Sequence, residues 1–241
     1  MGSGRIATLL ALGVSLFGLV LVLYGILGRR SDPLGDPANF LAADKGYGVT
    51  VDLTKYEDTE LNDLLADLRA SGLTWLRQPI NWAEIEMQPG QFSWDGLDRV
   101  LAAVARSNND HNAQPFKLIA VLQTTPAWAR KETQSETGPP VRLRDMGDFT
   151  RAVASRYANQ LDFYQIWHEP NLSAGWGNAF VNPDEYVALL REAAINIRDL
   201  DPTAYILLAA LAPTLEQTPL NQNELHYLDR LYLANAAPWF D

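Results

Sequence analysis

The stretch that decides the fold is FYQIWHEPN, residues 163–171, in which an apolar run ends abruptly in a carboxylate and a proline. The run Phe163–Trp167 is typical of a buried strand, and a strand that stops at Glu169-Pro170 directs the glutamate out of its end. In parallel α/β sheets and barrels, catalytic groups lie at the C-terminal ends of strands. Glu169 is therefore the first candidate for chemistry. A surface glutamate that begins a loop is the plain alternative.

Other segments share this strand-like pattern of short, mostly continuous apolar sequence, which is expected when both faces of a parallel sheet are covered. They are Val49–Leu53, Leu73–Ile80, Lys117–Leu122 and Tyr205–Ala210. Segments with helical spacing of apolar residues lie between them, and the clearest of these follows Asn182-Pro183, an N-cap with proline at the first helical position.

Residues 46–241 are thus predicted to form an α/β domain of about five βα units. A (β/α)8 TIM barrel needs eight units and typically about 250 residues, whereas a doubly wound sheet could be complete with five. The turn after the first predicted strand reads TKYE at 54–57, without the glycine-rich loop of a nucleotide-binding sheet. The long loops at 81–94, 123–146 and 168–182 instead indicate an active-site face.

Composition excludes several classes of function. The chain has 241 residues and a formal net charge of −10, so nucleic acid is not an expected partner, because phosphate binding needs a basic face. It has no cysteine, which excludes disulfides and thiolate metal sites. Its three histidines, His111, His168 and His226, lack the spacing of metal ligands. Neither a metal site nor a cofactor is predicted.

The N-terminal region has a different character. Residues 6–28 carry no charge over 23 positions, long enough to cross a bilayer core of roughly 30 Å. The run continues into Arg29-Arg30 without a small-x-small cleavage site, which favours an uncleaved signal anchor over residues 1–30. A cleaved signal peptide and a buried core helix are the alternatives. Residues 31–45 form a predicted linker. We expect a single-pass protein of the cell membrane, anchored through 6–28, with its domain outside the cytoplasm.

Tryptophans occur in three of the long loops, as Trp82, Trp128 and Trp176. Flat aromatic faces suit the C–H faces of sugar rings, so three on one face beside a strand-end glutamate favour a carbohydrate cleft. A packing role is the alternative for each ring. Arg77 lies within the second predicted strand, where a charged side chain needs a partner, and a carboxylate at a neighbouring strand end would provide one.

Taken together, these segments resemble the clan A glycoside hydrolases, which are (β/α)8 barrels, and in particular the cellulase-like and family 39-like group. The matching pieces are LRQPINW at 76–82, PGQFSW at 89–94, TPAWA at 125–129, IWHEPN at 166–171, and Leu228-Asp229 through APWFD at 237–241. The resemblance covers about residues 45–241 and implies an incomplete TIM barrel that ends where strand six is expected to begin.

The resemblance implies hydrolysis of O-glycosidic bonds in an oligo- or polysaccharide by a retaining double displacement, with Glu169 as general acid/base. His168 stands where the family has an asparagine that binds the sugar 2-OH, and an imidazole can donate the same bond. The family's nucleophile, a glutamate at the end of strand seven, is expected beyond residue 241. A non-catalytic sugar-binding or membrane-partner protein derived from such a barrel is the alternative. The expected substrate-binding set is Arg77, Trp82, Trp128, His168, Asn171 and Trp176.

Overall fold

The computed structural model describes residues 46–110 and 113–241. Their strands form one five-stranded parallel sheet in the order β1-β2-β3-β4-β5. The strands are β1 Tyr47–Thr50, β2 Leu73–Asn81, β3 Lys117–Gln123, β4 Phe163–Ile166 and β5 Tyr205–Leu207. The predicted parallel α/β architecture is confirmed.

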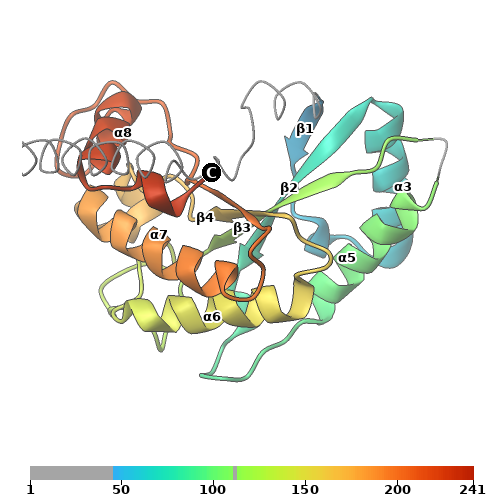
Figure 1. Cartoon of the computed structure of the whole chain (residues 1–241), viewed down its shortest axis with the longest axis horizontal. Helices are drawn as coiled ribbons and strands as arrows, with labels where there is room; N and C mark the ends of the chain where they lie inside the picture. Colours follow the sequence, from blue (N-terminus) through green and yellow to red (C-terminus); the bar gives the residue numbers. More distant parts are fainter. Residues whose placement is uncertain (1–45, 111–112) are drawn as a thin grey trace, which may run out of the picture. The chain divides into compact units, whose positions relative to one another are not determined.

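Helices connect consecutive strands, as in repeated βα units, and a last helix follows β5. They are α3 Asp58–Ala70, α4 Trp82–Ile85, α5 Asp95–Asn108, α6 Leu143–Tyr157, α7 Pro183–Arg198 and α8 Glu224–Leu233. Short 3-10 turns occur at η1 Leu53–Lys55, η2 Ser173–Trp176 and η3 Ala237–Trp239. In Figure 1, α3 and α5 lie along the β2 side of the sheet, and α6 and α7 lie beside one another along the later strands. The expected cap of α7 is present, because the Asn182 side chain accepts hydrogen bonds from the amides of Asp184 and Glu185.

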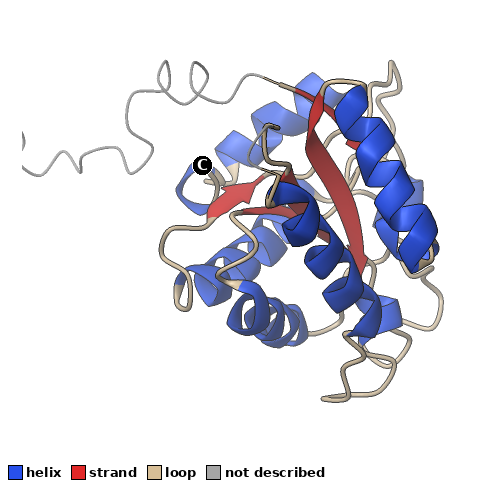
Figure 2. Ribbon diagram, turned by 90° about the vertical axis from the view of Figure 1, so that its right-hand side faces the viewer, coloured by secondary structure: helices blue, strands red, loops and turns tan. Residues whose placement is uncertain are grey.

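The sheet has one face toward the helices and one face that is more open. Burial alternates along β2, where Leu76, Gln78 and Ile80 are buried and the residues between them are partly exposed. Figure 2 shows the long twisted β2 with helices packed along the sheet. Because side chains alternate across a strand, Arg77 and Asn81 lie on the more open face, opposite the helices.

The first strand begins and ends earlier than predicted. It was expected at Val49–Leu53, but Asp52 turns the chain into η1 by accepting hydrogen bonds from the Thr54 amide at 3.2 Å and hydroxyl at 2.6 Å. Leu53 is fully buried beside this turn, and its amide donates to the Gln78 side chain at 2.8 Å. A capping aspartate inside an apolar run therefore ended the strand.

The predicted anchor at 6–28, within 1–30, and the predicted linker at 31–45 lie outside the residues that the structure describes. Among helices of the described part, none combines the length and apolar character that a membrane crossing needs.

Candidate active site

Glu169 lies just past the C-terminal end of β4 in an unusual backbone conformation. Trp167, with φ 74°, and Glu169, with φ 50°, both have a left-handed backbone conformation that residues other than glycine rarely adopt. Such residues each cost roughly 1–3 kcal/mol and concentrate at functional sites. Two ladder bonds hold this segment: the Trp167 amide donates to the Leu122 carbonyl, and the Glu169 amide donates to the Ala210 carbonyl, both at 2.9 Å. The Glu169 side chain remains 39% exposed.

The loop after Glu169 folds back onto its backbone. A Cβ atom on Gly175 would lie 2.1 Å from the Glu169 carbonyl oxygen, so only glycine allows η2 to lie this close. The Trp167 indole donates to the Gly175 carbonyl at 2.9 Å, which ties the loop to the strand end from the other side. This packing supports the strained peptide on which Glu169 sits.

Arg77 joins β2 to the β4 end across the intervening strand β3. Its Nε donates to Gln165 Oε1 at 2.9 Å, and its Nη2 lies 3.2 Å from His168 Nδ1. On the other side of the ring, His168 Nε2 lies 3.7 Å from Glu169 Oε1. The structure therefore brings together Arg77, His168 and Glu169, three of the residues expected at the site.

Electrostatics around His168 favour its neutral form. Burial lowers the pKa of His168 below its ordinary value, and the positive charge of Arg77 lowers it further, while the Glu169 carboxylate opposes both effects. Burial also lowers the pKa of Arg77, against the opposing effect of Glu169. An arginine nevertheless remains protonated in proteins, so the site holds a permanent cation beside the carboxylate.

Trp82 and Trp176, which were expected to bind substrate, are both buried in this structure. Trp82 is fully buried and stacks on Phe149, with ring centroids 5.2 Å apart. Its indole donates to Glu86 Oε2 at 2.6 Å. Trp176 is 1% exposed and packs edge-on against Trp167. The packing alternative holds for both rings, because large aromatic surfaces are buried wherever the loops cover the sheet.

Trp128 is partly exposed, but it lines a groove to which Glu169 does not contribute. The groove has a volume of about 640 Å³, and its lining includes Trp128, Phe92 and Arg142. The Trp128 indole donates to the Glu86 backbone carbonyl at 2.9 Å, which sets the orientation of the ring. The three tryptophans therefore do not share one surface with the strand-end glutamate.

Asn171 is also buried and serves the architecture of the loops. Its amide nitrogen donates to the carbonyls of Ala212 at 2.8 Å and Gln222 at 2.9 Å, and its oxygen accepts from the Ala212 amide at 3.0 Å. The side chain, which was expected to contact substrate, is fully buried in this structure. It instead holds both ends of the segment 213–221 that follows β5.

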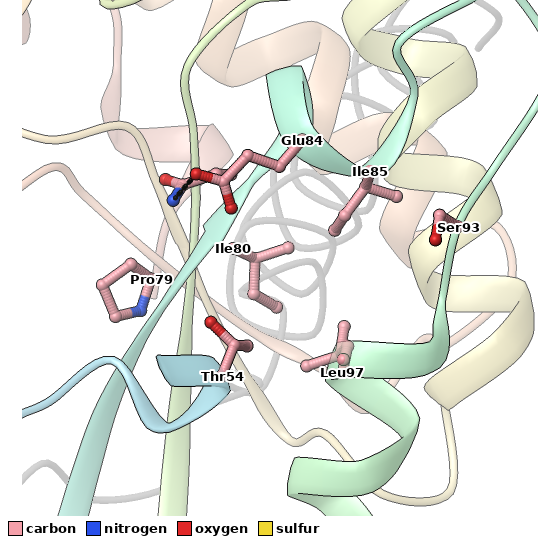
Figure 3. A pocket seen from close by; sticks show the side chains of 9 residues that line it. Thr54, Pro79, Ile80, Glu84, Ile85, Ser93 and Leu97 are labelled. Carbon is pink, nitrogen blue, oxygen red and sulfur yellow. Dashed lines mark hydrogen bonds between the residues drawn. The ribbon is translucent and has the colours of Figure 1, made fainter. Parts of the chain in front are cut away.

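A smaller pocket lies at the C-terminal end of β2, beside η1, α4 and the start of α5. Its volume is about 170 Å³, and Ile80, Ile85 and Leu97 supply its apolar lining (Figure 3). Glu84 lies at this pocket and accepts a hydrogen bond from Asn81 at 3.2 Å. Glu169 does not line it, so the pocket is separate from the cluster around His168.

Sequence reasoning missed two residues of the site, Gln165 and Gly175. Gln165 is a polar residue inside an otherwise apolar strand, which is a signal that a buried partner exists. For Gly175, nothing in the GWG sequence at 175–177 signals its close contact with the backbone of Glu169. In the described ranges, no group of three or more potential metal ligands gathers in one place.

No protein-family model and no curated protein matches the chain. Solved structures do match. A family 39 glycoside hydrolase from Bacteroides cellulosilyticus is 20% identical with a TM-score of 0.51, over 67% of this chain and 30% of that one. A β-xylosidase from Caulobacter crescentus is 19% identical with a TM-score of 0.53, over 67% and 35%. An exo-β-1,4-mannosidase from an Opitutaceae bacterium is 18% identical with a TM-score of 0.53, over 73% and 36%.

These likenesses concern the fold. The chain spans about a third of the length of each of these proteins. Its parallel α/β arrangement is that of part of the TIM barrels of clan A glycoside hydrolases, which confirms the resemblance drawn from the sequence.

Proposed function

We propose that this chain provides the general acid/base half of the active site of a retaining glycoside hydrolase. The observation that carries the proposal is the placement of Glu169. It follows the C-terminal end of β4 in a left-handed backbone conformation, with its partly exposed carboxylate beside His168. In TIM barrels, this end of the strands bears the catalytic groups.

In the proposed reaction, Glu169 protonates the glycosidic oxygen as the bond to the sugar breaks, and a second carboxylate forms the covalent glycosyl intermediate. Glu169 then removes a proton from the attacking water, which releases the sugar with retained configuration. The two carboxyl groups of retaining enzymes are about 5–5.5 Å apart. We place the second one on the seventh strand of a complete barrel, beyond residue 241.

The substrate is proposed to be a β-linked glycan. Solved structures with this fold include a β-xylosidase and an exo-β-1,4-mannosidase, which makes xylosides and mannosides the first substrates to test. Anchoring through residues 6–28, with the domain outside the cytoplasm, would place it where polymeric glycans occur.

The coding sequence after codon 241 provides the first test. The proposal expects further βα units and a glutamate at the end of the seventh strand. A protein that binds xylo- or manno-oligosaccharides without turnover, and that lacks this glutamate, would support the alternative of a non-catalytic sugar-binding protein.

The chemical test uses the complete barrel with p-nitrophenyl β-xyloside and β-mannoside. Glu169→Gln should abolish hydrolysis of unactivated oligosaccharides and spare the aryl glycosides more, because nitrophenolate needs little protonation to leave. Added azide should restore turnover by attacking the glycosyl intermediate and yield a β-glycosyl azide. Full activity of Glu169→Gln on oligosaccharides would refute the role of Glu169.

The chain of 241 residues supplies a further control. It is expected to show no turnover, because only one of the two required carboxylates is assigned. Turnover by this chain that is lost in Glu169→Gln would mean that another carboxylate, such as Glu84 or Glu216, acts as nucleophile. That result would refute the proposal that the nucleophile lies beyond residue 241.

A further inference from the structure

Gln165 is a buried polar residue at the centre of the hydrogen bonds around Glu169. It lies in β4 and is 5% exposed. Its Nε2 donates to the Trp167 carbonyl at 2.7 Å, and its Oε1 accepts from Arg77 Nε at 2.9 Å. Because a carbonyl can be met only by the NH2 end of the amide, the Trp167 contact determines that the oxygen end faces Arg77.

Arg77 transmits this orientation to the imidazole of His168. A guanidinium has donors and no acceptor, so His168 Nδ1, 3.2 Å from Arg77 Nη2, must receive the hydrogen bond with its lone pair. A ring nitrogen that accepts carries no proton, and the proton of the neutral ring is then on Nε2. The hydrogen bonds thus run from the Trp167 carbonyl through Gln165 and Arg77 to His168. The left-handed backbone of Trp167 positions the carbonyl that Gln165 binds.

The protonated Nε2 lies beside the catalytic candidate. Its distance of 3.7 Å from Glu169 Oε1 is too long for a direct hydrogen bond. One oxygen atom placed about 2.8 Å from each of them could accept from Nε2 and donate to the carboxylate. A sugar hydroxyl has the donor and the acceptor that this arrangement requires.

We propose that Gln165 is a positioning residue that acts through Arg77 to keep His168 neutral, with its proton on Nε2, as a hydrogen-bond donor for a sugar hydroxyl beside Glu169. The state of the imidazole follows from contacts within the chain, whereas its use toward a sugar rests on the proposed function.

The surrounding charges agree with this assignment. The charged groups that face His168 are Arg77 from β2 and Glu169 from its own loop, and the backbone of Ala210 beyond β5 forms the parallel bridge to residue 168. Burial and Arg77 both lower the pKa of His168, which favours the neutral ring. A doubly protonated ring would direct an Nδ1 proton at the guanidinium, and two donors cannot bond one another.

Nitrogen NMR of the whole chain tests the proposal without any substrate. In a sample with 15N-labelled histidine, long-range 1H–15N correlations distinguish a protonated ring nitrogen from an unprotonated one. The chain has three histidines, and the signals missing from a His168→Asn sample identify residue 168. At neutral pH, we expect a protonated Nε2 and an unprotonated Nδ1 for His168. A proton on Nδ1 would overturn the proposal.

Two matched substitutions test the part played by Gln165. Gln165→Met keeps a similar size but removes both hydrogen bonds, and His168 should then show a mixture of the two neutral tautomers. Gln165→Glu keeps an acceptor for Arg77 but loses the donor to the Trp167 carbonyl. The single Nε2–H tautomer should return, at a cost in stability. An unchanged tautomer in a folded Gln165→Met protein would refute the role of Gln165. If that variant does not fold, loss of the single tautomer in Gln165→Glu refutes the role instead.

Activity gives an independent measurement. In a complete barrel that hydrolyses aryl glycosides, Gln165→Met should lower kcat/KM about tenfold, the equivalent of about 1.4 kcal/mol, and Gln165→Glu should recover most of it. An inactive wild-type barrel with the expected His168 tautomer would refute the proposed hydrolysis and leave the positioning role of Gln165 in place.

Discussion

Gly175 lies on the backbone of Glu169 so closely that a Cβ atom at residue 175 would be 2.1 Å from the Glu169 carbonyl oxygen. Gly175→Ala should therefore push η2 away and destabilise the fold by about 1–3 kcal/mol, the usual cost of overpacking. Urea unfolding followed by fluorescence measures this loss. Gly96→Ala is the matched control, since its Cβ would meet only Thr54 atoms at 3.9 Å, and a helical alanine is favoured over glycine. Equal stability of Gly175→Ala and wild type would contradict the close contact.

The pH dependence of stability should report the environment of His168. Its pKa is lowered in the folded protein by burial and by Arg77, so the unfolded chain takes up the proton first as pH falls. The free energy of unfolding should decrease as pH falls below about 6.5, the ordinary histidine value, until the folded protein is protonated too. His168→Asn should remove this part of the dependence, measured by urea unfolding between pH 5 and 8. His226→Asn, at an exposed position of α8, should leave it intact.

Trp82 and Trp128 should differ in their contribution to stability. Trp82→Phe removes the donor to Glu86 Oε2 and leaves that buried carboxylate with its bond from the Gly90 amide at 2.7 Å. We expect a loss of about 2–3 kcal/mol, typical of a hydrogen bond to a charged group. Trp128→Phe removes a partly buried bond to a backbone carbonyl and should cost about 1 kcal/mol. Equal losses in urea unfolding would show that Glu86 does not depend on Trp82.

Asn171 should control the order of the segment after β5. Asn171→Ala removes three hydrogen bonds to Ala212 and Gln222, and we expect a loss of roughly 2–4 kcal/mol together with faster amide exchange over 213–222. Asn171→Asp should be as harmful at neutral pH, because a carboxylate oxygen would replace the donor that faces two carbonyls. Asn159→Ala, at an exposed turn, is the control. Unchanged exchange over 213–222 in Asn171→Ala would contradict this account.

The strands could be predicted from sequence because each is a short apolar run between polar loops, and β2, β3 and β4 lie within a residue of the expected bounds. The C-terminal end of β1 could not be predicted from sequence, because the hydrogen bonds of the Asp52 side chain end the strand. The last predicted strand, Tyr205–Ala210, is a regular strand only to Leu207, and Ala210 rejoins the sheet through an isolated bridge to His168.

For the candidate site too, some features could be predicted from the sequence and others could not. The cluster of Arg77, His168 and Glu169 followed from the rule that strand ends converge in a parallel sheet. The burial of each indole could not be predicted, since Trp82 begins α4, Trp128 lies in a loop and Trp176 ends η2, and only tertiary packing decides which ring is covered. Gln165 was overlooked because its partners, Arg77 and the Trp167 carbonyl, are brought to it by the fold.

The left-handed backbone at residue 169 has a consequence for evolution and engineering. Glycine and asparagine adopt φ 50° more readily than glutamate does, so either residue should relieve strain at this position. A library screened for thermal tolerance alone would therefore enrich Glu169→Gly and Glu169→Asn, and the most robust clones would have discarded the carboxylate. A glutamate retained at such a position in a natural sequence implies selection for something other than robustness.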